Sequence, residues 1–197
     1  MGLEPSEQAY VYEHLWRPVE QLFIYETQGT VMDAFFRHYL TMKLSRIPKQ
    51  GRVYEEFKLY HLNCEFGTII ELCQDLLEYA KYYTNIVFKR NTDTDLKKLY
   101  EDIIDLRMKV SYPFLLKIHH DCAEGLITSD ELKKILKLCI SCVLRRAICE
   151  IPTNSMNKTF ATLKNYIRPD DYLNSVKAFF VMQDTYKEFP DNDKFEG

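Results

Sequence analysis

The helix junction around Pro152 gathers basic and amide side chains of the kind that bind an anion. The apolar helical pattern of VLRRAICE ends at Ile151, because proline disfavours the α region for the residue before it. A new helix then begins near Thr153 or Asn154, either of which can cap it by accepting a bond from a free amide. Free amides at a helix N-terminus favour phosphate. The candidate phosphate contacts at this junction are Arg145, Asn154, Asn157 and Lys158.

The same junction also has a purely structural interpretation, in which Arg146 ties helices together. Successive helical residues differ by about 100° in direction. Arg146 therefore returns to the apolar stripe of Cys139, whereas Arg145 points to the polar side. A buried guanidinium needs a carboxylate or several carbonyl groups, since an unpaired buried charge is very unfavourable. On this interpretation Arg146, Pro152 and Thr153 are structural, and Arg146 is the more buried arginine.

A basic segment from Arg37 to Lys58 is the second candidate contact surface. Six basic residues against Glu55 and Glu56 give it a charge of +4, whereas the whole chain carries −3. A basic loop with tyrosines nearby fits the backbone of a nucleic acid, and an ordinary solvated surface is the alternative. The basic residues of the segment are Arg37, Lys43, Arg46, Lys49, Arg52 and Lys58.

The run His119-His120-Asp121-Cys122 contains metal-ligand types, but its spacing does not predict a metal site. These residues lie within a predicted helix, where neighbouring side chains diverge. His120 and Glu124 are one turn apart and can share a ligand, yet two ligands do not make a site. The chain also lacks a phosphate-binding glycine loop and a nucleophile elbow. We therefore expect no catalytic residue, no metal and no cofactor in this chain.

The elements that would position these residues are predicted to be helices, so the fold class is all-α, a bundle of antiparallel helices. Apolar residues from Ile69 to Val87 and from Leu96 to Val110 recur at spacings of three and four, which indicates two packed amphipathic helices. We expect one helical domain over 1–183, with 1–62 as a possible subdomain, and a flexible acidic tail over 184–197. The expected helices are 7–15, 18–26, 30–45, 53–62, 69–87, 96–110, 112–125, 128–150, 153–167 and 170–183.

Amino-acid composition indicates the class of protein and its cellular location. Hydrophobic residues make up 46% of the 197 residues, which is a globular balance. The six cysteines do not form the two C-x-x-C motifs that a paired zinc knuckle needs. Several of them lie at apolar helical positions, which favours buried, reduced thiols. The sequence contains neither a signal core nor an apolar stretch long enough to span a bilayer. We expect a cytoplasmic protein without membrane contact.

Three stretches resemble one protein family. They are RRAICEIPTNSMNKTFATL, the segment WRPVE with FFRHYLTMKLSRIPK, and YPFLL from Tyr112 to Leu116. In their order along the chain they resemble the central helical region of the GmrS/GmrD-type (GmrSD) restriction endonucleases, over most of the chain from about 10 to 195. The family's chemical motifs, an upstream DGQQR-type nucleotide segment and a downstream HNH nuclease segment, are not in this sequence.

The resemblance implies a non-catalytic helical scaffold segment of a nucleotide-dependent DNA restriction or phage-defence protein. The whole protein would then be an NTP-dependent HNH endonuclease that needs an NTP and a divalent metal. Its flanking nuclease and nucleotide domains would be the partners of this segment. Two alternatives remain open: a nucleic-acid-binding module that contacts DNA weakly through the basic segment, and a protein-interaction or dimerisation domain that forms a homo-oligomer.

Overall fold

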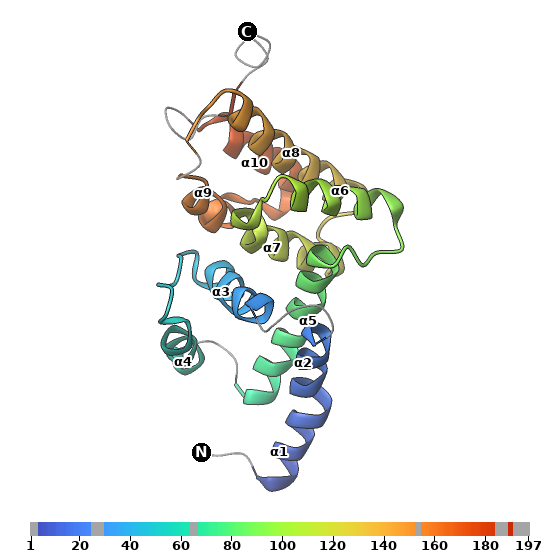
Figure 1. Ribbon diagram of the computed structural model, residues 1–197, viewed down its shortest axis with the longest axis vertical. Helices are drawn as coiled ribbons and strands as arrows, with labels where there is room; N and C mark the ends of the chain where they lie inside the picture. Colours follow the sequence, from blue (N-terminus) through green and yellow to red (C-terminus); the bar gives the residue numbers. More distant parts are fainter. Residues whose placement is uncertain (1–3, 25–29, 64–66, 153–154, 184–188, 191–197) are drawn as a thin grey trace.

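A computed structural model describes residues 4–24, 30–63, 67–152, 155–183 and 189–190. In these ranges every regular element is a helix, and there is no strand. Figure 1 shows an elongated molecule with α1 at one end and α8 to α10 at the other. The all-α prediction is confirmed. Across the described residues, no helix combines the length and the apolar composition that crossing a membrane requires.

The first helical arm is continuous from Pro5 to Phe23, although a break before Pro18 was expected. It consists of α1 (Pro5–Val11), a π-helical turn η1 (Tyr12–Trp16) and α2 (Arg17–Phe23). Proline cannot donate to the helical ladder, and its ring crowds the preceding turn. The wider π turn, in which Arg17 N–H bonds to the Tyr12 carbonyl, accommodates this defect, so the two expected helices are one.

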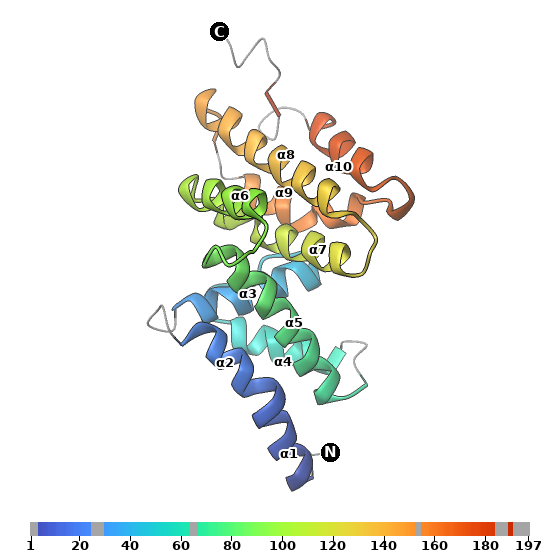
Figure 2. The same ribbon diagram turned by 90° about the vertical axis from the view of Figure 1, so that its right-hand side faces the viewer.

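Three further helices complete the N-terminal half. They are α3 (Thr30–Leu44), α4 (Val53–Asn63) and α5 (Ile69–Val87), and α5 begins with a capping box between Thr68 and Glu71. Helix α3 packs on α5 and on α7, whereas α4 contacts α3 and contains no fully buried residue. Helix α4 is therefore only half covered; Figure 1 shows it at the edge of the molecule, and in Figure 2 it lies behind α5.

The C-terminal half surrounds α7 (Tyr112–Ala123), which buries eight of its twelve residues. A helix that is covered on nearly all sides belongs to the core. Helix α7 contacts α3, α5, α8 (Ser129–Ile148) and α9 (Met156–Thr162). The chain ends in the 3₁₀ turns η4 (Leu163–Tyr166) and η5 (Pro169–Asp171) and then α10 (Tyr172–Val181).

Helix α6 (Thr94–Asp105) does not form the simple antiparallel hairpin with α5 that its sequence pattern indicated. It packs chiefly on α8, and the Lys133 ammonium lies 2.7 Å from Asp93 and 3.6 Å from Asp95 at the start of α6. Lys89 turns the chain after α5 in a left-handed conformation, with φ of 55°. The short linker then leads α6 across the end of α5 (Figure 1).

Four helices end at a non-glycine residue with positive φ. These residues are Ser45, Lys89, Arg107 and Glu150, with φ between 52° and 55°. At three of these ends the next amide donates to the carbonyl five residues earlier, as Ile151 N–H does to the Arg146 carbonyl at 2.9 Å, which is the 6→1 bond of a Schellman motif. This closure ends α8 at Ile148, three residues before the break predicted from Pro152.

One cluster of buried apolar side chains runs through the molecule from Val19 to Phe180 and includes side chains from both halves. Rings are frequent in it: Phe35 contacts Phe23 and Tyr83, and Phe160 contacts Phe114 and Phe180. Phe189, from the expected tail, packs on the Phe180 ring. Two residues of that tail are thus held against the core, and 184–188 and 191–197 lie outside the described residues.

Candidate functional site

The structure places Arg146 as the helical phase predicts. Its side chain is 1% exposed. Its Nη2 donates to the Pro152 carbonyl at 2.7 Å and to Ser155 Oγ at 3.2 Å. Both acceptors follow the chain break, so the guanidinium ties the end of α8 to the start of α9. A cation near the carbonyl end of a helix is also favoured by the helix dipole. The prediction that Arg146 is the more buried arginine is confirmed, and its partners are of the helix-end type.

Arg145 is only partly buried and points away from the junction. Its Nε donates to Ser141 Oγ at 3.3 Å and its Nη1 to the Pro190 carbonyl at 3.1 Å. Its guanidinium carbon also lies 5.8 Å from the Phe189 ring centre. The groups expected to hold an anion are therefore not all together, because Arg145 contacts the C-terminal segment instead.

Asn157 and Lys158 are exposed at the first turn of α9, whereas Thr153 and Asn154 lie outside the described residues. Helix α9 itself begins at Met156, and Ser155 occupies its N-cap position without a side-chain capping bond. The junction is thus built around Arg146, and the two remaining candidates, Asn157 and Lys158, face solvent.

In the basic segment, glutamates of the same segment pair with two of the six basic residues. Arg46 lies 2.5 Å from Glu56, and Arg52 lies 2.6 Å from Glu55. The Arg46 guanidinium, through a hydrogen bond and its charge, lowers the pKa of the Glu56 carboxyl. Because both pairs lie within the segment, Arg46 and Arg52 are already paired with carboxylates and are less able to bind nucleic-acid phosphates.

Two other basic residues of the segment are directed inward. The Lys43 ammonium lies 2.9 Å from Asp75 on α5 and faces the Tyr79 ring at 4.6 Å from its centre. Arg37 Nε donates to the Pro48 carbonyl at 3.4 Å. Among the segment's cations, Lys49 and Lys58 are the exposed ones without a described ion pair. The count of +4 did not include Asp75, which is distant in sequence.

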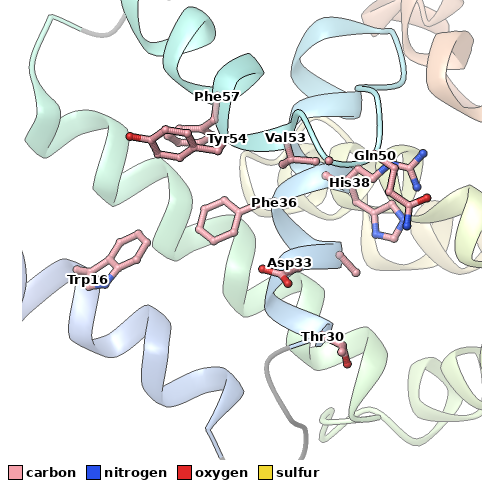
Figure 3. Close-up of a pocket in the computed structure, with 12 residues that line it drawn as sticks. Trp16, Thr30, Asp33, Phe36, His38, Gln50, Val53, Tyr54 and Phe57 are labelled. Atoms are coloured by element: carbon pink, nitrogen blue, oxygen red, sulfur yellow. The ribbon is translucent and has the colours of Figure 1, made fainter.

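An aromatic groove opens beside this segment, between η1, α3 and α4 (Figure 3). Its volume is about 780 Å³, typical of a site for a ligand or a side-chain cluster. Trp16 and Phe36 stack with ring centres 6.1 Å apart, and Phe36 meets Phe57 edge-on at 5.7 Å. Tyr54, which is 81% exposed, closes the α4 side.

The groove has a polar side on α3. Figure 3 shows Asp33 on the same face of α3 as Phe36, with Trp16 opposite and His38 and Gln50 at the far end. Burial, together with the charges of Arg37 and Lys109, lowers the pKa of His38 to about 4, so this imidazole is neutral at pH 7. Asp33 supplies a carboxylate to the groove, and Arg37, one turn further along α3, supplies a guanidinium.

The histidine pair of α7 separates, as the helical spacing requires. His119 is buried; its Nδ1 lies 2.7 Å from the Leu115 carbonyl and its Nε2 2.7 Å from the Tyr100 hydroxyl. Since a carbonyl only accepts, Nδ1 carries the proton and Nε2 accepts. Burial lowers the pKa of His119 to about 4. His119 is thus a packed, neutral core residue.

Asp121, on the next turn, is a buried carboxylate, 1% exposed. It accepts a bond from the Tyr172 hydroxyl on α10 at 2.5 Å and pairs with Lys117. Burial and the neighbouring carboxylate both raise the pKa of the Tyr172 phenol, which therefore remains a donor. This contact ties α7 to α10, and the sequence offered no signal for it because Tyr172 is 51 residues away.

Comparison of the chain with protein-family models, with curated proteins and with solved structures found no match in any of the three. The aromatic groove was not predicted from the sequence either. Trp16 and Phe36 lie in helices that the sequence predicts, but nothing in their spacing indicates a groove. Only the fold shows that they line an open groove.

Proposed function

We propose that this chain is a non-catalytic helical scaffold whose aromatic groove holds a segment of a partner protein. The single observation that carries the proposal is the groove itself: stacked rings open to solvent beside a half-covered helix. Elsewhere on α4, Leu59 and Leu62 are also exposed, at 56% and 69%. Exposed apolar patches of this kind are typical of protein–protein contact sites.

The occupant that fits best is an amphipathic helix with a large apolar side chain one turn from a lysine or arginine. The apolar side chain would lie between Trp16 and Phe57, in the way that apolar residues of a helix enter a partner's groove. The cation would lie near Asp33 and the face of Trp16, where charge attraction and a cation–π contact add. The pairing of Arg46 and Arg52 with glutamates favours this occupant over nucleic acid.

The resemblance supplies the wider setting of the proposal. On that basis the chain is the scaffold segment of a GmrSD-like DNA restriction or phage-defence protein, and the partner segment belongs to its nuclease or nucleotide domain. NTP and divalent metal would then be used by those domains. The coding sequence on either side should encode DGQQR-type and HNH segments; if it encodes neither, the restriction setting is wrong and the groove proposal still stands.

The groove can be tested through Trp16, because it is the single tryptophan of the chain. We expect an amphipathic peptide built from leucine and lysine to change Trp16 fluorescence in a saturable way. A peptide of the same pattern with glutamate in place of lysine should bind about fivefold more weakly, since one cation–π or charge contact contributes on the order of 1 kcal/mol.

Two variants and one control make the test specific. Tyr54→Ala and Asp33→Asn should each weaken binding of the leucine–lysine peptide, and neither residue is needed for the core because both are exposed. Tyr166→Ala removes an exposed ring from the other half and should leave binding unchanged. Equal binding by all three variants would refute the groove, and tight binding of duplex DNA that Lys49→Glu abolishes would favour the nucleic-acid alternative.

A further inference from the structure

Three side chains with metal-ligand atoms meet on the surface between α5 and α7, on a site that the proposed function does not use. They are Glu78 of α5, His120 of α7 and Glu124 at the end of α7, and one ligand atom of each lies within 4.8 Å of the other two. Glu78 and His120 are partly buried and Glu124 is exposed. The sequence offered only His120 and Glu124; the fold adds the third ligand.

Neighbouring rings hold two of the three groups in place. The His120 imidazole stacks on Tyr79, with ring centres 5.2 Å apart and planes 5° from parallel. The Tyr82 hydroxyl donates to Glu78 Oε1 at 2.5 Å. Burial and the Glu78 and Glu124 carboxylates raise the pKa of Tyr82, so it stays a donor. Groups that orient a ligand in this way are typical of metal sites.

A second observation concerns the same imidazole. The His120 Nδ1 atom is buried and has no hydrogen-bond partner among the described residues. The Asp121 carboxylate oxygen is 3.8 Å away, beyond hydrogen-bond distance. A buried unpartnered nitrogen is unusual and often marks a bound water or ion. In addition, two carboxylates this close repel each other unless a cation lies between them.

We infer that Glu78, His120 and Glu124 form a binding site for a divalent transition-metal ion such as Zn²⁺, which clamps α5 to α7. One imidazole and two carboxylates suit Zn²⁺ or Co²⁺, whereas Mg²⁺ and Ca²⁺ prefer oxygen ligands alone. Three protein ligands leave room for water to complete the coordination. The clamp would join the N-terminal half to the central helix of the C-terminal half.

The direct test is to remove any bound metal from the full chain with a chelator and then to titrate the chain with metal ions. Binding of Zn²⁺ is followed by calorimetry and binding of Co²⁺ by visible absorption. We expect one ion per chain and a melting temperature that rises with Zn²⁺ concentration, because a ligand that binds only the folded state stabilises it. His120→Ala and Glu124→Gln should each weaken binding at least tenfold, and Tyr82→Phe should weaken it by a similar factor through Glu78.

The controls address histidine and thiol binding elsewhere. His14→Ala removes an exposed histidine of the first arm, and Cys122→Ser removes the nearest thiol in sequence; both should leave the affinity unchanged. Spectra of the Co²⁺ form should lack a thiolate charge-transfer band. Unchanged Zn²⁺ affinity in both His120→Ala and Glu124→Gln would overturn the site. Asp33→Asn should not affect metal binding, so failure here is distinct from failure of the groove.

Discussion

In the N-terminal half, the arginine–glutamate pairs lie at the surface, whereas the C-terminal half buries several of its titratable side chains. Arg46 and Arg52 are more than half exposed and each meets a nearby glutamate. Arg146 and Asp121, by contrast, are each 1% exposed: Arg146 donates to groups six and nine residues further on, and Asp121 accepts from Tyr172, 51 residues away. The two kinds of pair thus differ in burial rather than in sequence separation, since Arg46 and Glu56 are ten residues apart.

The difference shows which charges hold the fold together. An exposed pair contributes little, because water and salt screen it and two long side chains must be ordered. A buried group that loses its partner is strongly destabilising, because its charge or its lone pairs are left without water. Three changes, from the largest expected effect to the smallest, test whether this contrast between the halves is real.

Arg146→Ala should have the largest effect and lower the free energy of unfolding by about 3–5 kcal/mol, as expected when a large buried side chain is removed and its acceptors lose their donor. It leaves a cavity and removes the donor to the Pro152 carbonyl and the Ser155 hydroxyl. Arg145→Ala should lose about 1 kcal/mol, the net value of ordinary hydrogen bonds. Urea unfolding followed by circular dichroism measures both variants. Equal losses would mean that the two arginines are equivalent, contrary to their burial.

Acid should weaken the fold through the buried histidines. The pKa of His119 is about 4 in the folded chain, against an ordinary value of 6.5. The unfolded chain therefore binds a proton first as the pH falls, so stability is complete above about 6.5 and is lost towards pH 4. A gap of about 2.5 pH units corresponds to on the order of 3 kcal/mol.

His119→Gln tests this assignment, because an amide can donate to the Leu115 carbonyl and accept from Tyr100 without titrating. The fall in unfolding free energy between pH 6.5 and 4 should become about half as steep, with His38 accounting for the rest. His14→Gln, at an exposed position, is the matched control and should leave the slope unchanged. An unaltered slope in His119→Gln would place the acid sensitivity elsewhere.

Reversal of the exposed pair should have the smallest effect. Arg46→Glu with Glu56→Arg exchanges the two charges without changing their sum, and we expect an unfolding midpoint equal to that of the parent chain within error. Thermal melts at low and high salt measure it. A large loss in the double variant would mean that this pair, like the buried groups, fixes the fold.

The sequence predicts the helices themselves well, since Ile69 to Val87 and the Thr128 cap of α8 follow directly from spacing and capping. It also predicts which of Arg145 and Arg146 is buried, because that depends on helical phase alone. It fails where partners are distant. Asp75 pairs with Lys43, α6 packs mainly on α8 instead of α5, and Glu78 lies beside His120. Each of these contacts joins residues that are distant in sequence, so a local pattern does not contain it.

The left-handed helix ends are positions at which substitution by glycine can increase the stability of the fold. A non-glycine residue in this conformation costs about 1–2 kcal/mol, and glycine would remove that cost while adding about 0.4–1 kcal/mol of chain entropy to the unfolded state. Glycine at Lys89, Arg107 and Glu150 thus offers a small gain at each of three helix ends, whereas at Ser45 it would remove the hydroxyl that donates to Asn165 at 2.9 Å. Because none of these positions lines the groove or supplies a ligand to the Glu78, His120 and Glu124 site, a thermostabilised version could be assembled without altering either candidate site.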